Sequence, residues 1–383
     1  MGFQSEQRPG PAGRVRLGGK RGRAAGSGRK TAGMSLPRGL FLFFPVWLLF
    51  LSCAANPVWN SSREITVMTY NVHNLFDAVS DGGEYPEYDP AEGEWTEKDY
   101  ENRLANTADV IRGAVRGGPD VVLCQELEHL SVLRDLVEGY LPDMGYGVYG
   151  EEGWRQSGVV VGALSRIPVE KVLIHAVRMA DGTVGRGIAE LWIRSGESEV
   201  VLFNNHWKSK LGGAAETEPQ RRAEAALVAA RVAEILADDA DREIVIAGDF
   251  NEQISEFENT GGCYPTALRS LDSIPAGILP DGSGTLFVMP VSSESCGGSL
   301  VVRSPWFDVE EGGSYWFNGE WERIDHIFMT AGFFDGKGFD FSGFSVVALP
   351  FMIDDAGVPQ AWSARTGKGD RKSTRLNSSH IPL

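Results

Sequence analysis

The chain has 383 residues, with 36 lysine and arginine side chains against 52 aspartates and glutamates, and a formal net charge of −16 at pH 7. Without residues 1–53 and 370–383 it keeps 24 basic and 50 acidic side chains, a net charge of −26. A body this acidic does not attract polyanions over a long range, which argues against tight binding of duplex DNA and suits a centre that recruits divalent cations.

The first 53 residues are expected to lie outside the fold. Residues 1–33 are rich in glycine and arginine without apolar periodicity, so we interpret them as a disordered basic leader or a misassigned start before Met34. Residues 34–53 have a basic lead, a short apolar block and small residues around Cys53, which is typical of a signal peptide. The position of Cys53 resembles a bacterial lipobox. We therefore expect export, as a lipoprotein anchored to a membrane through Cys53 or as a secreted or periplasmic protein, with a retained anchor as a third alternative.

The remaining cysteines fit an exported protein. Cys124 lies in an apolar segment, where a free cysteine is usually a small core residue. Cys263 and Cys296 lie in loops rich in glycine and serine, and either form a disulfide in an oxidising compartment or are two unrelated thiols.

Residues 64–369 are expected to form one domain in which strands and helices alternate. After the first strand comes a polar, acidic insertion at 77–95, and after residue 252 a long region rich in glycine and serine. Several strands are apolar on both faces, which implies sheets covered on both sides and an α/β layered sandwich. The predicted strands are 65–70, 121–125, 158–164, 187–193, 200–205, 244–247, 314–317, 324–329 and 344–349, and the predicted helices are 96–115, 130–137 and 219–236.

Residues 244–252 are the most informative segment. An apolar strand runs into Gly248, and because side chains alternate along a strand, Asp249 and Asn251 should point to one side and Phe250 to the other. An acidic acceptor and an amide donor would then lie side by side above an apolar anchor. By itself this pattern is also typical of an ordinary Asp/Asn turn.

Four more predicted strands end or begin with polar side chains. Taken one at a time, Glu126 reads as a solvated carboxylate, His206 as a structural histidine and Asp325 as a turn residue or a partner of Arg323. Together they indicate a site, because layered α/β folds place ligands at the carboxyl ends of their strands. The segments are YNVHNLFD from Tyr70, CQE from Cys124, NNHWK from Asn204, GDFN from Gly248 and RIDH from Arg323.

In this order the five segments resemble the endonuclease/exonuclease/phosphatase superfamily of deoxyribonuclease-like phosphoesterases, over nearly all of residues 64–349. The resemblance implies a four-layer sandwich of two mixed β-sheets flanked by helices, with the site between the sheets at one end. It also implies a bound Mg²⁺, or Mn²⁺, with Glu126 as the metal-binding glutamate and Asn71 as the amide near the metal. A single carboxylate suits Mg²⁺, which keeps much of its hydration.

The resemblance assigns catalytic roles to four residues. Asp249 would orient or deprotonate the attacking water, and Asn251 and His206 would hold the phosphoryl oxygens. Asp325 would pair with a final histidine. Lys208 would add a positive charge for phosphate, or is a solvated loop lysine.

Three further histidines, His73, His326 and His380, have other expected roles. His73 stands where some nucleases of the superfamily carry an acid, so the number of metals is left open, and His326 should point away from Asp325 and be structural. The superfamily usually ends in a Ser-Asp-His motif, which His380 resembles. We expect that match to be accidental, because residues 370–380 look like a translated sequencing adapter, and we expect the true histidine to be lost and activity to be severely reduced.

The leading functional hypothesis is Mg²⁺-dependent hydrolysis of phosphodiester bonds by a monomer, with nucleic acid as the first substrate. One alternative is an enzyme acting on lipid or small phosphoesters, favoured by the acidic body and the lipid anchor. The other is a non-catalytic surface lipoprotein that uses the sandwich only for binding.

Overall fold

The structure is a computed structural model that describes residues 64–92, 95–151, 158–179, 181–274, 284–293 and 301–362, with the backbone of residues 378–382. Its strands form two mixed sheets and a small hairpin. In spatial order the first sheet contains β15 (Ser345–Val347), β16 (Ser378–Pro382), β1 (Thr66–Leu75), β2 (Val121–Leu127), β4 (Val160–Ser165) and β3 (Gly147–Gly150). The second contains β5 (Val169–Arg178), β6 (Val184–Ser195), β7 (Ser198–His206), β8 (Glu243–Asp249), β14 (Asp325–Met329), β11 (Val301–Ser304), β10 (Leu286–Pro290) and β9 (Leu268–Ser270). The hairpin pairs β12 (Tyr315–Phe317) with β13 (Glu320–Glu322), and the helices are α1 (Glu97–Ala114), α2 (Leu130–Tyr140), α3 (Ala214–Asp238) and α4 (Glu256–Asn259).

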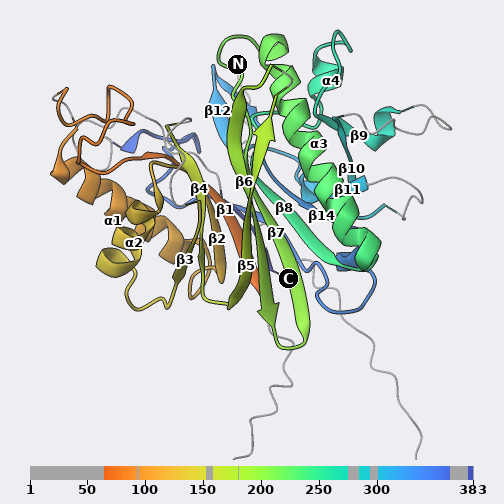
Figure 1. Ribbon diagram of the computed structural model, residues 1–383, viewed down its shortest axis with the longest axis horizontal. Helices are drawn as coiled ribbons and strands as arrows, with labels where there is room; N and C mark the ends of the chain where they lie inside the picture. The colour runs from red at the N-terminus through yellow and green to blue at the C-terminus, as the bar shows by residue number, and fades with distance from the viewer. Residues whose placement is uncertain are drawn as a thin grey trace, which may run out of the picture. The chain divides into compact units, whose positions relative to one another are not determined.

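Alternating side chains cover both faces of each sheet. In β1, Val67 packs into the core between the sheets, whereas Met68 packs into the core that α1 and α2 complete. In β8, Val245 belongs to the core between the sheets and Ile246 to the core beneath α3. Figure 1 shows the resulting layers, with α1 and α2 on one side of the paired sheets and α3 on the other. The predicted four-layer α/β sandwich is therefore confirmed.

Local sequence explains the limits of α1. Thr96 caps the helix, since its hydroxyl accepts the backbone N–H of Asp99 while the Asp99 carboxylate accepts the N–H of Thr96. Leu104, Ala108 and Ile111 are buried along one stripe. The prediction of a helix over 96–115 is thus correct to within one residue at each end.

The prediction for α3 needs a correction. We expected the helix to start at Pro219, but it begins five residues earlier, at Ala214, and Pro219 lies inside it. We placed the start at Pro219 because proline is common in the first turn of a helix. In the added turn, the backbone oxygen of Ala214 accepts a hydrogen bond from the Arg221 guanidinium at 2.7 Å.

Seven strands that the structure describes are absent from the predicted set, namely β3, β5, β9, β10, β11, β13 and β16. β3 and β9 are very short, and β5 is an edge strand whose side chains are mostly half-buried or exposed, so it has no continuous apolar run. β10 and β11 lie in the region that we interpreted as a loop rich in glycine and serine. Short apolar runs between such segments carry little periodic signal.

Strand directions bring the predicted site segments to one edge. β1 and β2 are parallel, as are β7 and β8, so the carboxyl ends in each pair coincide. β14 runs antiparallel to β8 with Asp325 opposite Asp249, so the start of β14 meets the end of β8. Gly248 allows β8 to lie close to β7, because a Cβ there would lie 2.0 Å from the backbone oxygen of Asn205.

Several predictions fall outside the described residues. These are the leader at 1–33, the signal peptide at 34–53 with Cys53, the pairing partner Cys296 and the adapter-like segment up to residue 377. Of the described cysteines, Cys124 is buried and Cys263 is exposed. Within the described part of the chain, no helix is long and apolar enough to cross a membrane.

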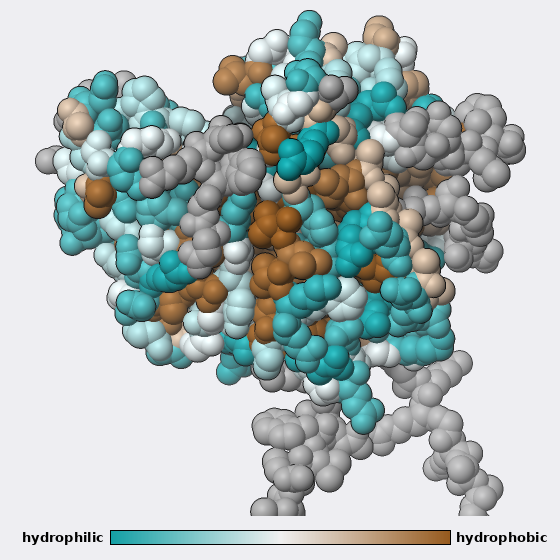
Figure 2. All heavy atoms as spheres, viewed as in Figure 1, coloured by the Kyte–Doolittle hydropathy of each residue, from teal (hydrophilic) through white to brown (hydrophobic). Residues whose placement is uncertain are grey.

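Figure 2 shows one face of the molecule, on which hydrophilic residues cover much of the described surface. Apolar residues gather near the middle of this face, over the strands labelled β5 to β7 in Figure 1. Ile174 of β5 is among the large hydrophobic side chains that are exposed.

Candidate active site

The site is centred on two carboxylates and an imidazole from three strands. Glu126 lies in β2, His206 ends β7 and Asp249 ends β8. The His206 Nε2 atom is 3.7 Å from Glu126 Oε1 and 4.0 Å from Asp249 Oδ2, and one donor atom from each residue lies within 4.8 Å of the others. Asp249 and His206 are buried, while Glu126 is 13% exposed in its side chain. A ligand would therefore first meet the carboxylate of Glu126.

Asn71 joins the two carboxylates. Its Nδ2 donates to Glu126 Oε1 at 2.8 Å and to Asp249 Oδ2 at 2.9 Å, and its Oδ1 accepts the backbone N–H of His73 at 2.8 Å. The backbone donor fixes the orientation of this amide, since only the oxygen can accept it. In this orientation Asn71 offers the carboxylates two N–H groups instead of an oxygen ligand. The expected role of Asn71 beside a metal stays a prediction.

Asn251 and Asp325 lie beside Asp249. The backbone N–H of Asn251 donates to Asp249 Oδ1 at 2.9 Å, and its side-chain amide donates to the backbone oxygen of Trp207 at 3.0 Å. Asp325 is buried opposite Asp249, with its backbone N–H bonded to Ser314 Oγ at 3.1 Å. The structure thus brings both predicted residues to the same edge as Glu126.

Backbone strain is concentrated at this edge. Five described residues other than glycine have a positive φ, and four of them lie within the last three residues of β1 or β2 or two residues after β8: His73 (61°), Asn74 (59°), Glu126 (63°) and Asn251 (52°). Such conformations cost free energy unless the surroundings enforce them, and they cluster at functional sites. At Glu126 the register of β2 with its neighbours shifts, which turns this side chain toward the site.

A buried polar bridge beneath the site joins the two sheets. Gln125 of β2 donates to Asn204 Oδ1 of β7 at 2.6 Å, and Asn204 donates to the backbone oxygens of Cys124 and Gly162 at 3.0 and 2.8 Å. Sequence reasoning placed both residues at strand ends without predicting this contact. The bridge fixes the distance between Glu126 on one sheet and His206 on the other.

A buried ion-pair network supports the segment around Lys208 and Asn251. Arg221 contacts Glu218 Oε2 at 2.6 Å and Glu252 Oε2 at 3.0 Å, and donates to the backbone oxygen of Lys208 at 3.0 Å. The backbone N–H of Lys208 is held by Glu224 Oε2 at 2.9 Å. The backbone of Lys208 is therefore fixed beside the site, and phosphate binding by its ammonium group stays a prediction.

The buried carboxyl of Glu224 should make the stability of the fold depend on pH. Burial raises the pKa of its carboxyl to about 7. A carboxyl whose folded-state pKa is raised holds its proton more tightly when folded, so stability falls as pH rises from about 4.5 to 7, by up to about 3 kcal/mol. We expect the free energy of unfolding of Glu224→Gln to equal that of the parent chain near pH 4.5 and to exceed it at pH 8. Urea unfolding at both pH values tests this, and a difference that does not change with pH would contradict it.

The donor set fits a divalent cation. One donor atom each from Glu126, Asp249 and His206 lies within 4.8 Å of the others, a grouping that could hold a metal ion. The carboxylates suit Mg²⁺, and the imidazole equally suits Mn²⁺. Glu126, the more accessible carboxylate, is therefore the residue that would hold an ion here, with Asp249 and His206 beside it.

The remaining histidines have different environments. His326 is fully buried, its Nε2–H donates to the backbone oxygen of Glu252 at 2.9 Å, and burial lowers its pKa to about 4. This agrees with a structural role. Residue 380 lies in β16, where its backbone is opposite Met68 of β1 and Ser345 of β15. The role of the His380 side chain lies outside what the structure describes.

The sequence matches the profile of the Endonuclease/Exonuclease/phosphatase family over residues 66–263, which is half of the chain. No curated protein matches the sequence. Among solved structures, truncated TDP2 of Caenorhabditis elegans is 16% identical, with 84% of this chain and 98% of that chain covered and a TM-score of 0.48. A Bacteroides thetaiotaomicron protein described as a member of the same family is 15% identical (84% and 96% covered, TM-score 0.45), and the catalytic domain of human Nocturnin with bound sulfate is 14% identical (70% and 83% covered, TM-score 0.43).

Proposed function

Because the chain belongs to the endonuclease/exonuclease/phosphatase family, we propose that it is a Mg²⁺-dependent phosphodiesterase with nucleic acid as its first candidate substrate. Members of the family are metal-dependent phosphoesterases, and the family generally uses a divalent metal. The observation that carries the proposal is the group formed by Glu126, His206 and Asp249, whose donor atoms lie within 4.8 Å of one another.

When bound, Mg²⁺ would neutralise negative charge on a phosphoryl oxygen. Asp249 is the candidate general base. Each of its oxygens accepts one N–H, from Asn71 and from Asn251, and a carboxylate has lone pairs left for a further donor. Asp249 would take the proton of the attacking water as the water oxygen bonds to phosphorus and the bond to the leaving oxygen breaks.

Two further side chains would hold the phosphoryl group. The Asn251 amide uses one N–H for Trp207 and has a second for a phosphoryl oxygen. His206 Nε2, close to both carboxylates, would donate to another oxygen when protonated. Asp325 would pair with the final histidine that the family resemblance implies.

The test is nicking of supercoiled plasmid by the full chain in Mg²⁺, with enzyme in excess because a low rate is expected. Glu126→Ala is expected to lose at least about 100-fold in rate, since it removes the accessible carboxylate of the site. Glu138→Ala, an exposed glutamate in α2, is the matched control and should nick at the parent rate. Equal rates for Glu126→Ala and the parent chain would rule out this site.

A second candidate is phosphodiester hydrolysis in a lipid. It is favoured by the net charge of −26 on residues 54–369, which opposes long-range attraction of nucleic acid. We also propose export, with a signal peptide at 34–53 and a lipid anchor at Cys53, and a monomeric state. Release of phosphocholine from sphingomyelin, or of phosphate from phosphoinositides, without plasmid nicking would favour the lipid substrate.

A further inference from the structure

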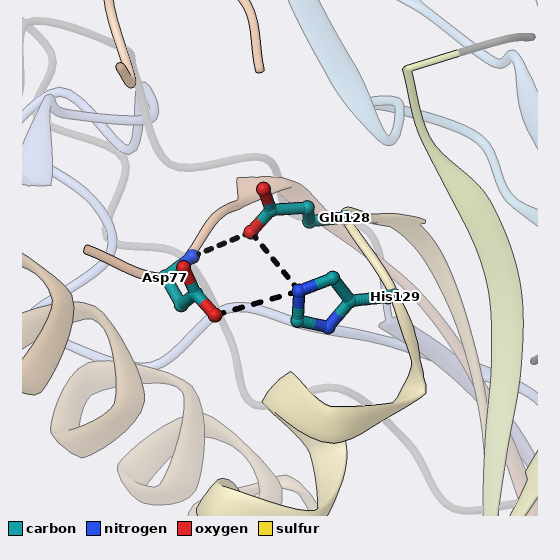
Figure 3. A group of neighbouring side chains, drawn as sticks. All are labelled: Asp77, Glu128 and His129. Atoms are coloured by element: carbon teal, nitrogen blue, oxygen red, sulfur yellow. Dashed lines mark hydrogen bonds and ion pairs between the residues drawn. The ribbon is translucent and has the colours of Figure 1, made fainter. Parts of the chain in front are cut away.

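A second group of side chains that could hold a metal ion lies just beyond the ends of β1 and β2 (Figure 3). Asp77 follows β1 by two residues, and Glu128 and His129 directly follow β2. The parallel pairing of these strands brings the three side chains together. His129 Nε2 is 3.4 Å from Asp77 Oδ2 and 3.7 Å from Glu128 Oε2, and the backbone N–H of Asp77 donates to Glu128 Oε2 at 2.8 Å. The function proposed above uses none of these groups.

The orientation of His129 suits a ligand. Its Nδ1 atom contacts Ser131 Oγ, at the start of α2, so its Nε2 atom faces the two carboxylates (Figure 3). Histidines that bind metals usually have their other ring nitrogen held by a hydrogen bond of this kind, which fixes the tautomer and the direction of the ring. Ser131 therefore acts as a positioning residue for Nε2.

One oxygen of the buried Glu128 carboxylate accepts no hydrogen bond from the described residues. Its side chain is only 5% exposed, and Oε1 is shielded from solvent with no hydrogen-bond partner among the described residues. Glu128 also shares a second group with Asp81 and Glu84, whose oxygens lie within 4.8 Å of its own. Burying a carboxylate oxygen without a donor, beside other acids, is unfavourable unless a positive charge is bound or the carboxyl takes up a proton. Burial raises the pKa of Glu128 to about 7, and a bound cation would keep the carboxylate ionised.

The distances between the ligand atoms match those around a small cation of intermediate hardness, such as Zn²⁺. Tetrahedral ligands at 2.0–2.2 Å from Zn²⁺ lie about 3.3–3.6 Å apart, close to the 3.4 and 3.7 Å measured from His129 Nε2. One imidazole nitrogen with carboxylate oxygens favours Zn²⁺ over Mg²⁺ or Ca²⁺, which prefer oxygen ligands.

We propose that Asp77, Glu128 and His129 form a second site, which binds a divalent cation of the Zn²⁺ class and is separate from the site at Glu126. A cation there ties the start of the acidic segment after β1 to the end of β2, two residues from Glu126. The rival explanation is an ion pair of protonated His129 with the two carboxylates, without a metal. The hydrogen bond to Asp77 raises the pKa of His129, which favours such an ion pair. The experiment below distinguishes the ion pair from a bound metal.

The test measures metal content and does not use activity. The full chain is stripped with chelator, dialysed against Zn²⁺ and analysed by elemental mass spectrometry, alongside His129→Ala and Glu126→Gln. We expect His129→Ala to bind one Zn²⁺ fewer per chain than the parent, and Glu126→Gln to keep the ion that His129→Ala loses. Titration with Co²⁺, followed by visible absorption, should give a band in the parent chain and in Glu126→Gln that His129→Ala lacks.

A variant that keeps all three ligands separates weaker metal binding from misfolding. Ser131→Ala leaves all three ligands in place and is expected to weaken Co²⁺ binding about tenfold, and circular dichroism reports whether each variant is folded. Equal Zn²⁺ content and identical Co²⁺ spectra in the parent chain, His129→Ala and Ser131→Ala would overturn the proposal. A parent chain that binds no ion at this site would establish the ion-pair explanation. Neither result depends on whether the chain hydrolyses phosphodiesters.

Discussion

The Asp249→Asn variant is expected to lower kcat for phosphodiester hydrolysis by about 10²- to 10⁴-fold, the range that one general base contributes. Asparagine has nearly the same shape but cannot accept the proton of the attacking water. KM should change little, because Asn251 and His206 remain to hold the phosphoryl group. The measurement is single-turnover plasmid nicking in Mg²⁺ at several plasmid concentrations.

Folding of this variant must be checked separately. Both oxygens of Asp249 accept N–H groups, so one asparagine N–H will face a donor, at a cost of about 1–3 kcal/mol. Asp241→Asn changes an exposed aspartate in the turn before β8 and is the matched control, with no expected effect on kcat. A folded Asp249→Asn protein with kcat within threefold of the parent would remove Asp249 from the role of base.

The edge on which the site forms could be predicted from the sequence. Polar residues follow apolar strands at Glu126, His206 and Asp249, and parallel neighbours place such ends together. The prediction worked because it needed only strand positions and directions. The limits of α1 were also predictable, since its cap and its apolar stripe lie within one segment.

The orientation of Asn71 and the contact between Gln125 and Asn204 could not be predicted in this way. The Asn71 amide meets carboxylates 55 and 178 residues away, the second on the other sheet, and Gln125 meets Asn204 79 residues away across the two sheets. The positive φ of Glu126 depends on a register shift that leaves no periodic signal. The group around His129 was missed because Asp77 reads as part of a polar insertion until β1 and β2 are paired.

Arg221 is the residue whose loss should cost the most stability. Its side chain is fully buried and lies between the carboxylates of Glu218 and Glu252, while it also holds the backbone oxygens of Ala214 and Lys208. Arg221→Met fills much of the same volume but leaves two buried carboxylates without a cation. Removing one partner of a buried ion pair typically costs about 3–5 kcal/mol, and we expect a loss of that size in urea unfolding at pH 8.

The matched control replaces an exposed lysine in the same way. Lys337 pairs with Asp241 at 2.6 Å, but their side chains are 69% and 62% exposed, so Lys337→Met should cost less than about 1 kcal/mol. Burial raises the pKa of Glu252 well above its usual value, so lower pH, which favours the neutral carboxyl, should reduce the damage in Arg221→Met. Adding Glu252→Gln to Arg221→Met should recover part of the loss at pH 8 for the same reason. A loss below about 1 kcal/mol, or one that grows as pH falls, would show that Arg221 holds these loops by packing and not by charge.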